Sequence, residues 1–415
     1  MFKKIIIVGG GIAGLTLANF LKKSNFNNFR IYERFERKSS RPTGIQLTPN
    51  AVRILDFLDT KFFLNNNFHR INYLSINPVH SGDFTSKFEV RMNLQNIVSD
   101  KIPYLTCDRN ILIKFLEKNL TPKEIFYNKQ VVQTIKDHNI IRVKFSDGSE
   151  DYCDLLVSAD GMFSKSRLDN NIIKNTNFYA YRGVLKNFYS KYSLENDVVR
   201  LWLSGNKHLV TYFINNQNDL SFTGISKSSQ KTTYTSDDVN YSIPFPADQF
   251  RSLFFSENKI LRETLDTLHE VYRWPIFSLK KRVFYRDNQI FIGDSSHGTV
   301  PFQAQGAALA IEDSYVLYEQ IIKNVTNNLG VFYFNKRNSR VRRIILRSHL
   351  NIFLFHLKNP FFIILRSILF KIIEKSFLAK KLMFGWIFNY NPRSSSYFFC
   401  FFLLSDLVDI IYFPF

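Results

Sequence analysis

KKIIIVGGGIAG, residues 3–14, is the stretch that decides the fold of this chain. Ile5–Val8 contains only β-branched apolar residues, which predicts a buried parallel strand. Three glycines follow in the spacing G-x-G-x-x-G, and an apolar helix is expected over residues 15–21. A second short strand, Phe29–Tyr32, ends in Glu33. Strand, glycine turn, helix, strand and acid together form the dinucleotide-binding fingerprint.

Each glycine of this fingerprint has a physical role. Gly9 permits the tight turn after the strand, and Gly11 leaves the backbone open to a pyrophosphate. Gly14 lets the helix pack closely on the strand, while the helix N-terminus offers unpaired N–H groups to phosphate. Glu33 can accept a hydrogen bond from a ribose hydroxyl. A signal peptide is the alternative for a Lys-Lys pair before an apolar run, but it explains neither the glycine spacing nor Glu33.

The composition limits the remaining classes. A chain of 415 residues predicts two structural domains. The three cysteines, Cys107, Cys153 and Cys400, form no C-x-x-C pair, so neither a disulfide framework nor a metal site is expected. We therefore expect the protein to occupy a reducing, cytoplasmic compartment. The formal charge of +20 is explained by lysine enrichment, or else it indicates that the protein binds an anionic surface or an anionic ligand. Nucleic acid is not expected as a partner, because no binding motif or concentrated basic arm is present.

Periodicity predicts the other elements. Residues 41–51 are expected to form a loop that leads into a helix ending near Leu58. Asp108 or Thr106 is expected to cap a helix that carries Ile111 and Leu112. Strands are expected at 71–76, 87–91, 131–135, 141–145, 198–202 and 208–213, helices near 247–270 and 306–318, and a basic helix from about 336.

Two further buried strands resemble the first, because each ends in a glycine or acid motif. Residues 154–159 lead to Asp160-Gly161, and residues 289–292 lead to Gly293-Asp294. Ligands of open α/β sheets bind at the carboxyl ends of strands. The three ends are therefore expected to converge on one cofactor, although Asp160-Gly161 alone would pass for an ordinary turn.

At this level the chain resembles the single-component FAD-dependent aromatic monooxygenases of the para-hydroxybenzoate hydroxylase type, and within them the salicylate hydroxylase-like branch. The resemblance covers roughly residues 3–345. It is carried by GGGIAGL (9–15), GIQLTPNA (44–51), DRNIL (108–112), DLLVSADG (154–161) with Ser164 and Arg167, and GDSSHGTVPFQAQGAA (293–308) continuing to IED (311–313).

The resemblance implies an α/β fold: a Rossmann-like FAD-binding domain, an inserted and mostly antiparallel β-sheet substrate domain, and a C-terminal helical region. The expected FAD-binding domain is discontinuous, at 1–70, 100–178 and 280–335. The substrate domain is expected at 71–99 and 179–279, and the C-terminal helices with an apolar tail at 336–415.

The resemblance also implies the cofactor contacts. Asp294 would bind the ribityl chain, Arg109 would reach the FAD from the start of its helix, and Val132 would lie beside the adenine. Pro301 would sit against the isoalloxazine. The expected cofactor-binding residues are Gly9, Gly11, Ile12, Ala13, Gly14, Glu33, Arg34, Gly44, Ile45, Arg109, Val132, Asp160, Gly161, Asp294, Pro301, Gly306 and Ala307.

His297, Pro301, His208 and Tyr212 are the catalytic candidates. His297 lies inside a motif, but it can equally shape its loop and satisfy a backbone carbonyl. His208 and Tyr212 share one face of a predicted strand, and the alternative is that both are ordinary half-buried strand residues. Asp313 is expected to be a helix-surface or salt-bridge residue.

The implied reaction is hydroxylation of a salicylate- or hydroxybenzoate-like substrate with NADH or NADPH and O₂, through a flavin C4a-hydroperoxide. Ser295-Ser296 replaces the family's Ala-Ala, and this exchange of small residues is expected to be harmless. No phenol-deprotonating tyrosine network can be placed, which leaves the substrate open. The alternatives are an epoxidase or hydroxylase of a larger lipid or polyketide, and a non-hydroxylating FAD-binding regulatory protein.

The C-terminus is aromatic and apolar at 361–369 and 396–415. Asp406 and Asp409 argue against a transmembrane helix. An interfacial helix, with peripheral membrane contact through the basic helix at 336–347, remains an expectation beside a packed terminal element. A non-native tail read out of frame is the third alternative.

Overall fold

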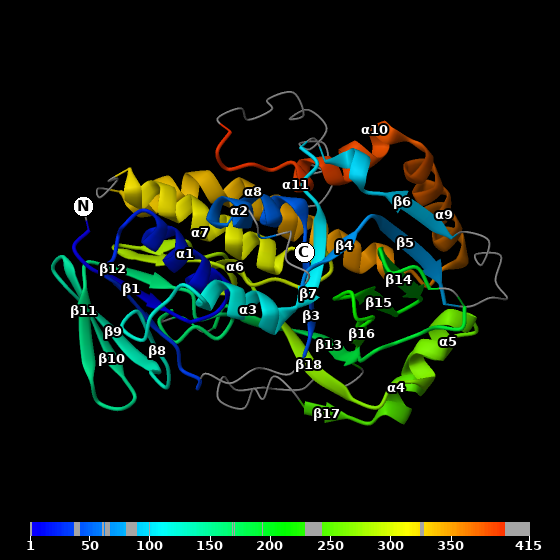
Figure 1. Cartoon of the computed structure of the whole chain (residues 1–415), viewed down its shortest axis with the longest axis horizontal. Helices are drawn as coiled ribbons and strands as arrows, with labels where there is room; N and C mark the ends of the chain where they lie inside the picture. The colour runs from blue at the N-terminus through cyan, green and yellow to red at the C-terminus, as the bar shows by residue number, and fades with distance from the viewer. Residues whose placement is uncertain are drawn as a thin grey trace.

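The structure is a computed structural model that describes residues 2–36, 42–59, 62, 67–79, 89–98, 100–167, 169, 171–192, 194–228, 243–323 and 328–394. The expectations for Cys400 and for residues 396–415 lie outside this part of the chain. The molecule is elongated, with a parallel sheet and its helices at one end and a larger antiparallel sheet at the other (Figure 1). The predicted α/β fold class is confirmed.

The parallel sheet forms at the predicted buried strands. Its order is β19-β20-β12-β1-β2-β8, and only β19 runs antiparallel to its neighbour. Its strands are β1 (Ile5–Val8), β2 (Phe29–Tyr32), β8 (Ile125–Phe126), β12 (Leu155–Ser158), β19 (Tyr285–Arg286) and β20 (Gln289–Phe291).

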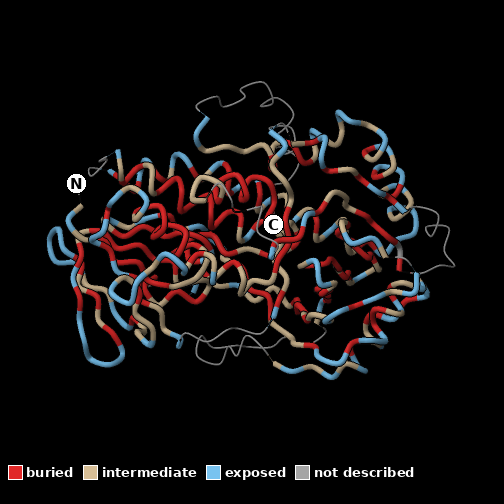
Figure 2. The backbone as a smooth tube through the Cα atoms, viewed as in Figure 1, coloured by how far each residue is buried: buried red, intermediate tan, exposed pale blue. Residues whose placement is uncertain are grey.

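Both faces of this sheet are covered, which explains why β1 is apolar without alternation. Ile5 and Ile7 pack in the core formed with helices α1 (Ile12–Lys23) and α7 (Gly306–Ile322). Ile6 and Val8 face the opposite side, toward a second layer. That layer is the sheet β11-β10-β9, built from β9 (Val131–Asp137), β10 (Ile140–Phe145) and β11 (Glu150–Cys153). Figure 2 shows this region as the most continuously buried part of the chain.

The substrate-domain sheet has eight strands in the order β17-β18-β13-β16-β15-β14-β5-β6. Every pairing is antiparallel except β14 with β5. The expected boundary at residue 179 falls inside β13. The strands are β5 (Tyr73–Pro78), β6 (Val90–Asn93), β13 (Ile173–Leu185), β14 (Val198–Ser204), β15 (Lys207–Phe213), β16 (Leu220–Lys227), β17 (Ile243–Phe245) and β18 (Val271–Leu279).

A small third sheet, β3-β7-β4, joins the two large ones. It contains β3 (Gly44–Leu47), β7 (Tyr104–Asp108) and β4 (His69–Ile71). The expectation of a loop throughout 41–51 is therefore wrong at β3, which pairs antiparallel with β7 before α2 (Pro49–Leu58) begins. A four-residue strand with one fully buried side chain carries almost no periodic signal.

Helices complete the structure. Asp108 caps α3 (Arg109–Glu117) by accepting from Asn110 N at 2.7 Å, as predicted. The 3₁₀ turn η3 (Gln95–Ile97) follows β6, while α4 (Ala247–Leu253) and α5 (Lys259–Asp266) cover one face of the large sheet. The short α6 (Asp294–His297) follows β20.

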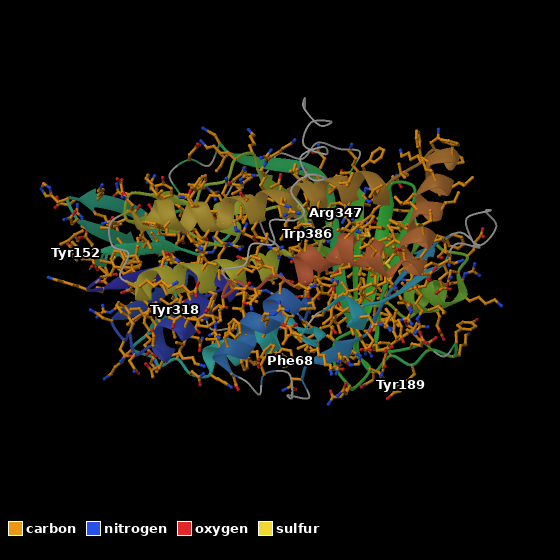
Figure 3. All side chains as sticks on the ribbon, turned by 90° about the horizontal axis from the view of Figure 1, so that it is seen from above. Phe68, Tyr152, Tyr189, Tyr318, Arg347 and Trp386 are labelled. Carbon is orange, nitrogen blue, oxygen red and sulfur yellow. The ribbon has the colours of Figure 1, made fainter. Side chains whose placement is uncertain are left out.

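The C-terminal region is helical, and its first helix is the longest of those described. From above, α8 (Leu329–Phe355) extends from the parallel-sheet end toward the substrate sheet, with Arg347 and Trp386 near the middle of the molecule (Figure 3). It is followed by α9 (Pro360–Lys375), α10 (Phe377–Lys380), the π-helical turn η4 (Lys381–Gly385) and α11 (Trp386–Phe388). Within the described residues, no helix is both long enough and apolar enough to cross a membrane.

Candidate active site

The three strand ends singled out by the sequence lie side by side. β12 pairs in parallel with both β1 and β20, so residues 9–14, 160–161 and 293–294 occupy one edge of the sheet. Arg167 ties two of these loops together, because its guanidinium donates to Ser295 O at 2.6 Å and to Met162 O at 2.7 Å. The predicted convergence of the strand ends is confirmed.

The fingerprint glycines divide into two kinds. Gly9 has a φ of +109°, and a Cβ there would lie 2.3 Å from Ala159 O. A Cβ on Gly14 would lie 2.1 Å from Gly9 O, so the approach of α1 to the strand permits no side chain. In contrast, a Cβ on Gly11, Gly161 or Gly306 would have no neighbour within 4 Å. These three glycines face open space, which forms a cradle for a ligand.

Two helix N-termini point donors at this cradle. Gly11 is the N-cap of α1 and Gln305 the N-cap of α7, and neither makes a side-chain cap. The first backbone N–H groups, those of Ile12 in α1 and of Gly306 and Ala307 in α7, are therefore available to an anion or to the polar edge of a ring. This arrangement fits the pyrophosphate and the flavin of FAD.

Charged residues from separate motifs surround the same space. Burial lowers the pKa of Arg109, and the carboxylates of Glu33 and Asp294 oppose that shift, so all three groups are electrostatic neighbours. The Asp294 side chain reaches solvent, yet enough protein atoms lie around its carboxyl group to raise its pKa. This combination is expected for a group that lines a recess. Asp160 Oδ1 is buried without a hydrogen-bond partner among the described residues. Unsatisfied acceptors of this kind suit the hydroxyls of a ribityl or ribose chain.

The other expected cofactor residues belong to several different elements. Glu33 accepts from Gly10 N at 2.7 Å, and Arg34 follows it with its guanidinium over Phe35. Ala13 is buried within α1. Gly44 and Ile45 lie on β3, paired with Asp108 and Cys107 beside Arg109. Val132 is 53% exposed on β9, and its assignment to the adenine stays a prediction.

His297 faces an acid in the core. Its Nε2 lies 2.6 Å from Asp313 Oδ2, and the side chains of the two residues are 2% and 0% exposed. The interpretation that this histidine satisfies a backbone carbonyl is therefore wrong at Nε2. Of the two expectations for Asp313, a helix-surface residue or a salt-bridge residue, the second is confirmed, and the salt bridge is buried. Its Oδ2 also accepts from Gly293 N at 2.8 Å, which fixes the turn that carries Asp294.

Two arginines of α8 complete a buried ionic cluster with α7. Arg337 donates to Asp313 Oδ1 at 2.7 Å and to Glu312 Oε2 at 2.8 Å. Arg340 donates to Glu312 Oε1 at 2.8 Å. Burial raises the pKa of Asp313, but His297 and Arg337 outweigh it and lower that pKa to about 2. The prediction that this helix offers its arginines to anionic lipid is thus wrong at Arg337 and Arg340.

α8 also holds the loop expected beside the flavin. Ser348 Oγ donates to Val300 O at 2.7 Å, and Asn351 Nδ2 donates to Phe302 O at 2.9 Å. Pro301 lies between these anchored residues and is partly exposed. Sequence reasoning missed this function of α8. The sequence signal that was available belongs to the ionic cluster: the polar pair Glu312-Asp313 lies inside an apolar helix, and Arg337 and Arg340 are spaced three apart in α8.

His208 and Tyr212 share a sheet face but have different neighbours. Tyr212 makes side-chain hydrogen bonds with Ser221 and Gln46, and burial raises its pKa to about 12. A Cβ on Gly44 would lie 2.8 Å from the Tyr212 hydroxyl, so this tyrosine borders the start of β3. His208 Nδ1 instead lies 2.9 Å from Nε2 of His356, at the end of α8. Burial lowers the pKa of His208 well below its usual value.

Arg182 is a residue that sequence reasoning missed. It lies on β13, opposite Tyr272 of β18, with its guanidinium 5.5 Å from the centre of the Trp274 ring. Its Nε is buried without a partner among the described residues. Burial lowers its pKa, and the charged groups that modify the shift are Tyr212 and Arg109, with no carboxylate among them. Arg182 is therefore a partly buried cation, an electrostatic neighbour of Arg109, and the part of the chain that the structure describes gives it no counter-charge.

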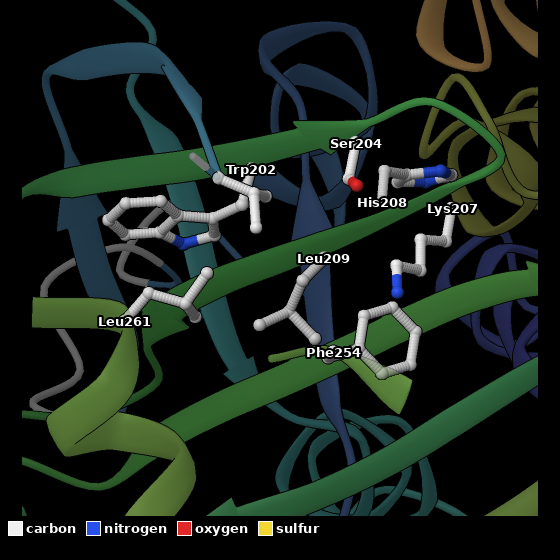
Figure 4. A pocket seen from close by; sticks show the side chains of 8 residues that line it. Trp202, Ser204, Lys207, His208, Leu209, Phe254 and Leu261 are labelled. Carbon is white, nitrogen blue, oxygen red and sulfur yellow. The ribbon is translucent and has the colours of Figure 1, made fainter. Parts of the chain in front are cut away.

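A small hollow behind the sheet is not part of this site. It is lined by Trp202, Lys207, Leu209, Phe254 and Leu261 on the side of α4 and α5, with His208 at its edge (Figure 4). It encloses no volume that a water molecule could occupy. The hollow is a packing gap between the sheet and its covering helices.

Residues 3–346 match the sequence profile of the family described as FAD binding domain. The chain belongs to this family. It is 26% identical over 372 residues to 6-hydroxynicotinate 3-monooxygenase of Bordetella bronchiseptica, covering 86% of this chain and 93% of that protein. It is 24% identical over 319 residues to 3-amino-4-hydroxybenzoate 2-monooxygenase PtnB3 of Streptomyces platensis, covering 76% and 78%.

Solved structures of the family share the fold. A salicylate hydroxylase substrate complex superposes with a TM-score of 0.75 at 19% identity, covering 94% of this chain and 96% of the other. Klebsiella pneumoniae HpxO with FAD and uric acid gives 0.75 at 18% identity, covering 92% and 96%. This member of the FAD binding domain family is an FAD-dependent monooxygenase, in the class that hydroxylates aromatic substrates.

Proposed function

We propose that this enzyme uses NADH or NADPH and O₂ to hydroxylate an aromatic carboxylate of the salicylate or hydroxybenzoate type. FAD, when bound, supplies the redox chemistry that activates oxygen. The chain's own residues hold the cofactor, bind the substrate ring, neutralise its charge and keep water out.

Arg182 is the observation that carries this proposal. Arg182 is partly buried, and its buried Nε–H has no hydrogen-bond partner among the described residues. A buried donor of this kind is costly unless an acceptor pairs with it. Arg182 and Arg109 are electrostatic neighbours of like charge, which adds to the cost. A carboxylate placed near Arg182 relieves both effects and can accept a forked pair of hydrogen bonds.

The surrounding residues suit an aromatic ring attached to that carboxylate. Trp274 lies under the Arg182 guanidinium, and Tyr212 lies on the same face of the sheet. With its pKa raised to about 12, Tyr212 remains protonated at neutral pH and can donate a hydrogen bond to a substrate oxygen. Gln46, which bonds to both Tyr104 and Tyr212, orients that hydroxyl.

The relatives support the same substrate class. One acts on a hydroxynicotinate and another on an aminohydroxybenzoate, both aromatic acids by name. A larger lipid or polyketide substrate remains the second candidate, because α8 to α11 cover this end of the sheet with apolar residues. A non-hydroxylating regulatory flavoprotein is the third, and no residue of the site favours it.

The experiment compares each aromatic acid with its neutral amide. Stimulated NADH and NADPH oxidation is measured with both, and products formed under ¹⁸O₂ are examined for one labelled ring oxygen. We expect acids to be hydroxylated and amides to bind poorly. Arg182→Gln is expected to raise KM for the acid by roughly 10–100-fold, as for a charged hydrogen bond, while FAD stays bound.

Arg273→Gln is the matched control. Arg273 lies on β18 beside Tyr272, and its guanidinium packs on Tyr179 and Phe245 in the layer that contains α4 and α5. Its replacement is expected to leave the acid-to-amide preference unchanged. If Arg182→Gln raises KM equally for acid and amide, Arg182 does not bind the carboxylate. If no aromatic compound yields labelled product, the assignment moves to the larger-substrate candidate.

A further inference from the structure

Helix α9 presents an apolar stripe to solvent. Six of its side chains are 44% to 68% exposed, and they recur at the one-, three- and four-residue steps of a single helical face. They are Phe361, Phe362, Leu365, Ile368, Leu369 and Ile372. A soluble monomer rarely leaves a contiguous apolar patch of this kind uncovered unless the patch binds something. We call these six residues the α9 stripe.

The opposite face of α9 is accounted for by the fold. Phe370 and Ile373 are buried against the core that includes Met92 of β6 and Leu201 of β14. The helix therefore has two apolar faces, and only one packs against the protein. The exposed face is an additional feature that folding does not require.

The stripe continues onto the next turn of chain and has a basic border. Phe377, Leu378 and Leu382 are 43% to 63% exposed just beyond it. Residues 356–385 contain six lysines and arginines and a single acid, Glu374. This edge of the molecule, the orange α9 and red-orange α10 at the right of Figure 1, thus combines exposed aromatic and aliphatic groups with positive charge.

We propose that α9 and α10 dock on an anionic lipid surface, with the α9 stripe lying in the interface plane. Apolar side chains on one face and flanking lysines are the pattern of interfacial helices, which bind through apolar burial and attraction to acidic headgroups. At 16 residues, α9 is too short to span a bilayer. This inference is independent of the proposed hydroxylation, because none of these residues belongs to the site.

Co-sedimentation of the FAD-loaded full chain with vesicles tests the proposal. The vesicles are phosphatidylcholine alone, or phosphatidylcholine mixed with phosphatidylglycerol. We expect binding to the anionic vesicles, and high salt should weaken it. Leu365→Asn combined with Ile372→Asn should lower the partition coefficient at least tenfold, because each change removes an inserted apolar side chain.

A charge variant tests the second contribution. Lys380→Gln combined with Lys381→Gln should lower binding to anionic vesicles by roughly 30-fold, about fivefold per lysine, and leave the weak binding to neutral vesicles unchanged. Tyr189→Ser combined with Phe255→Ser is the control, since these side chains are 74% and 56% exposed elsewhere on the surface. The control should bind as the parent does, and all variants should retain FAD.

Three results would overturn the assignment. The parent protein could fail to bind anionic vesicles. Leu403→Asn combined with Leu407→Asn, a change in the apolar C-terminal stretch, could abolish binding while the α9 variant binds normally. Sedimentation velocity could instead show a dimer that the α9 variant converts to monomer without vesicle binding, which would make a second copy the occupant of the stripe.

Discussion

Replacing Arg337 by methionine tests the buried ionic cluster between α7 and α8. Methionine preserves much of the aliphatic stem but removes the guanidinium. Three hydrogen bonds disappear: to Asp313 Oδ1 at 2.7 Å, to Glu312 Oε2 at 2.8 Å and to the Tyr390 hydroxyl at 3.2 Å. The cluster then holds two carboxylates and one arginine.

The expected cost follows from what remains. Removing one member of a fully buried ion pair typically costs about 3–5 kcal/mol, because the other charge stays buried. Here Arg340 still neutralises Glu312 and His297 still bonds Asp313, so the lower end of about 3 kcal/mol applies. Asp313 also holds Gly293 N, so the turn at Asp294 should loosen and FAD affinity should fall.

The pH dependence has a definite sign. In the parent protein the pKa of Asp313 is lowered to about 2, so its stabilising contribution persists above pH 4 or so and is lost as the pH falls toward 2. Without Arg337 the pKa of the folded carboxyls rises. The variant's deficit should therefore be greatest near about pH 7.5 and smaller near about pH 5, where a proton can neutralise one carboxylate.

Urea unfolding at a fixed excess of FAD provides the measurement, because bound cofactor adds its own stabilisation. Asn335→Gln, an exposed neighbour on the same helix, is the control and should change the unfolding free energy by less than about 0.5 kcal/mol. A deficit below about 1 kcal/mol for Arg337→Met, equal at both pH values, would refute the reasoning.

Three further predictions concern the site. Gly14→Ala should prevent normal folding, measured by far-UV dichroism, because its methyl would lie 2.1 Å from Gly9 O. Gly11→Val should leave apoprotein stability unchanged but abolish FAD binding, measured by flavin absorbance. Asp294→Ala should weaken FAD binding by roughly 10–150-fold, measured by fluorescence titration; unchanged affinity would place the ribityl chain elsewhere. His356, with its pKa lowered to about 4 by burial, should stay neutral above pH 5 or so, and ¹H–¹⁵N imidazole spectra showing titration near neutrality would contradict this.

The cofactor half of the fold was predictable because its signals are local. The run Ile5–Val8 and the glycines after it specify strand, turn and helix within a dozen residues. The buried strands β12 and β20 carry the same kind of signal, an apolar run that ends in a glycine and an acid. Their adjacency then follows from the rule that ligands bind at strand ends.

The ionic cluster was not predictable in the same way. Arg337 and Arg340 belong to a basic stretch, and basic stretches are usually solvated. Their burial depends on Glu312 and Asp313 in another helix, and sequence alone does not show which faces of two helices meet. β3 was missed for a related reason, since its pairing with β7 is tertiary.

Arg182 shows the corresponding limit for the substrate site. An arginine in a strand is ordinarily at an exposed position. Only the surrounding sheet shows that this one is partly buried, with no carboxylate beside it among the described residues. His208 and Tyr212 were correctly placed on one sheet face, but the end of α8 gives His208 a partner that no strand pattern encodes.

The discontinuity of the cofactor site has a consequence for how the enzyme is made. The residues expected to hold the cofactor extend from Gly9 to Gly306, and β20 joins the parallel sheet only after nearly 290 residues. A ribosome releases the fingerprint early, yet the cradle stays open on one side until β20 and α7 emerge. Cofactor loading is therefore a late event in biogenesis, and a shortage of riboflavin would leave full-length apoenzyme, not truncated intermediates, as the species exposed to proteases.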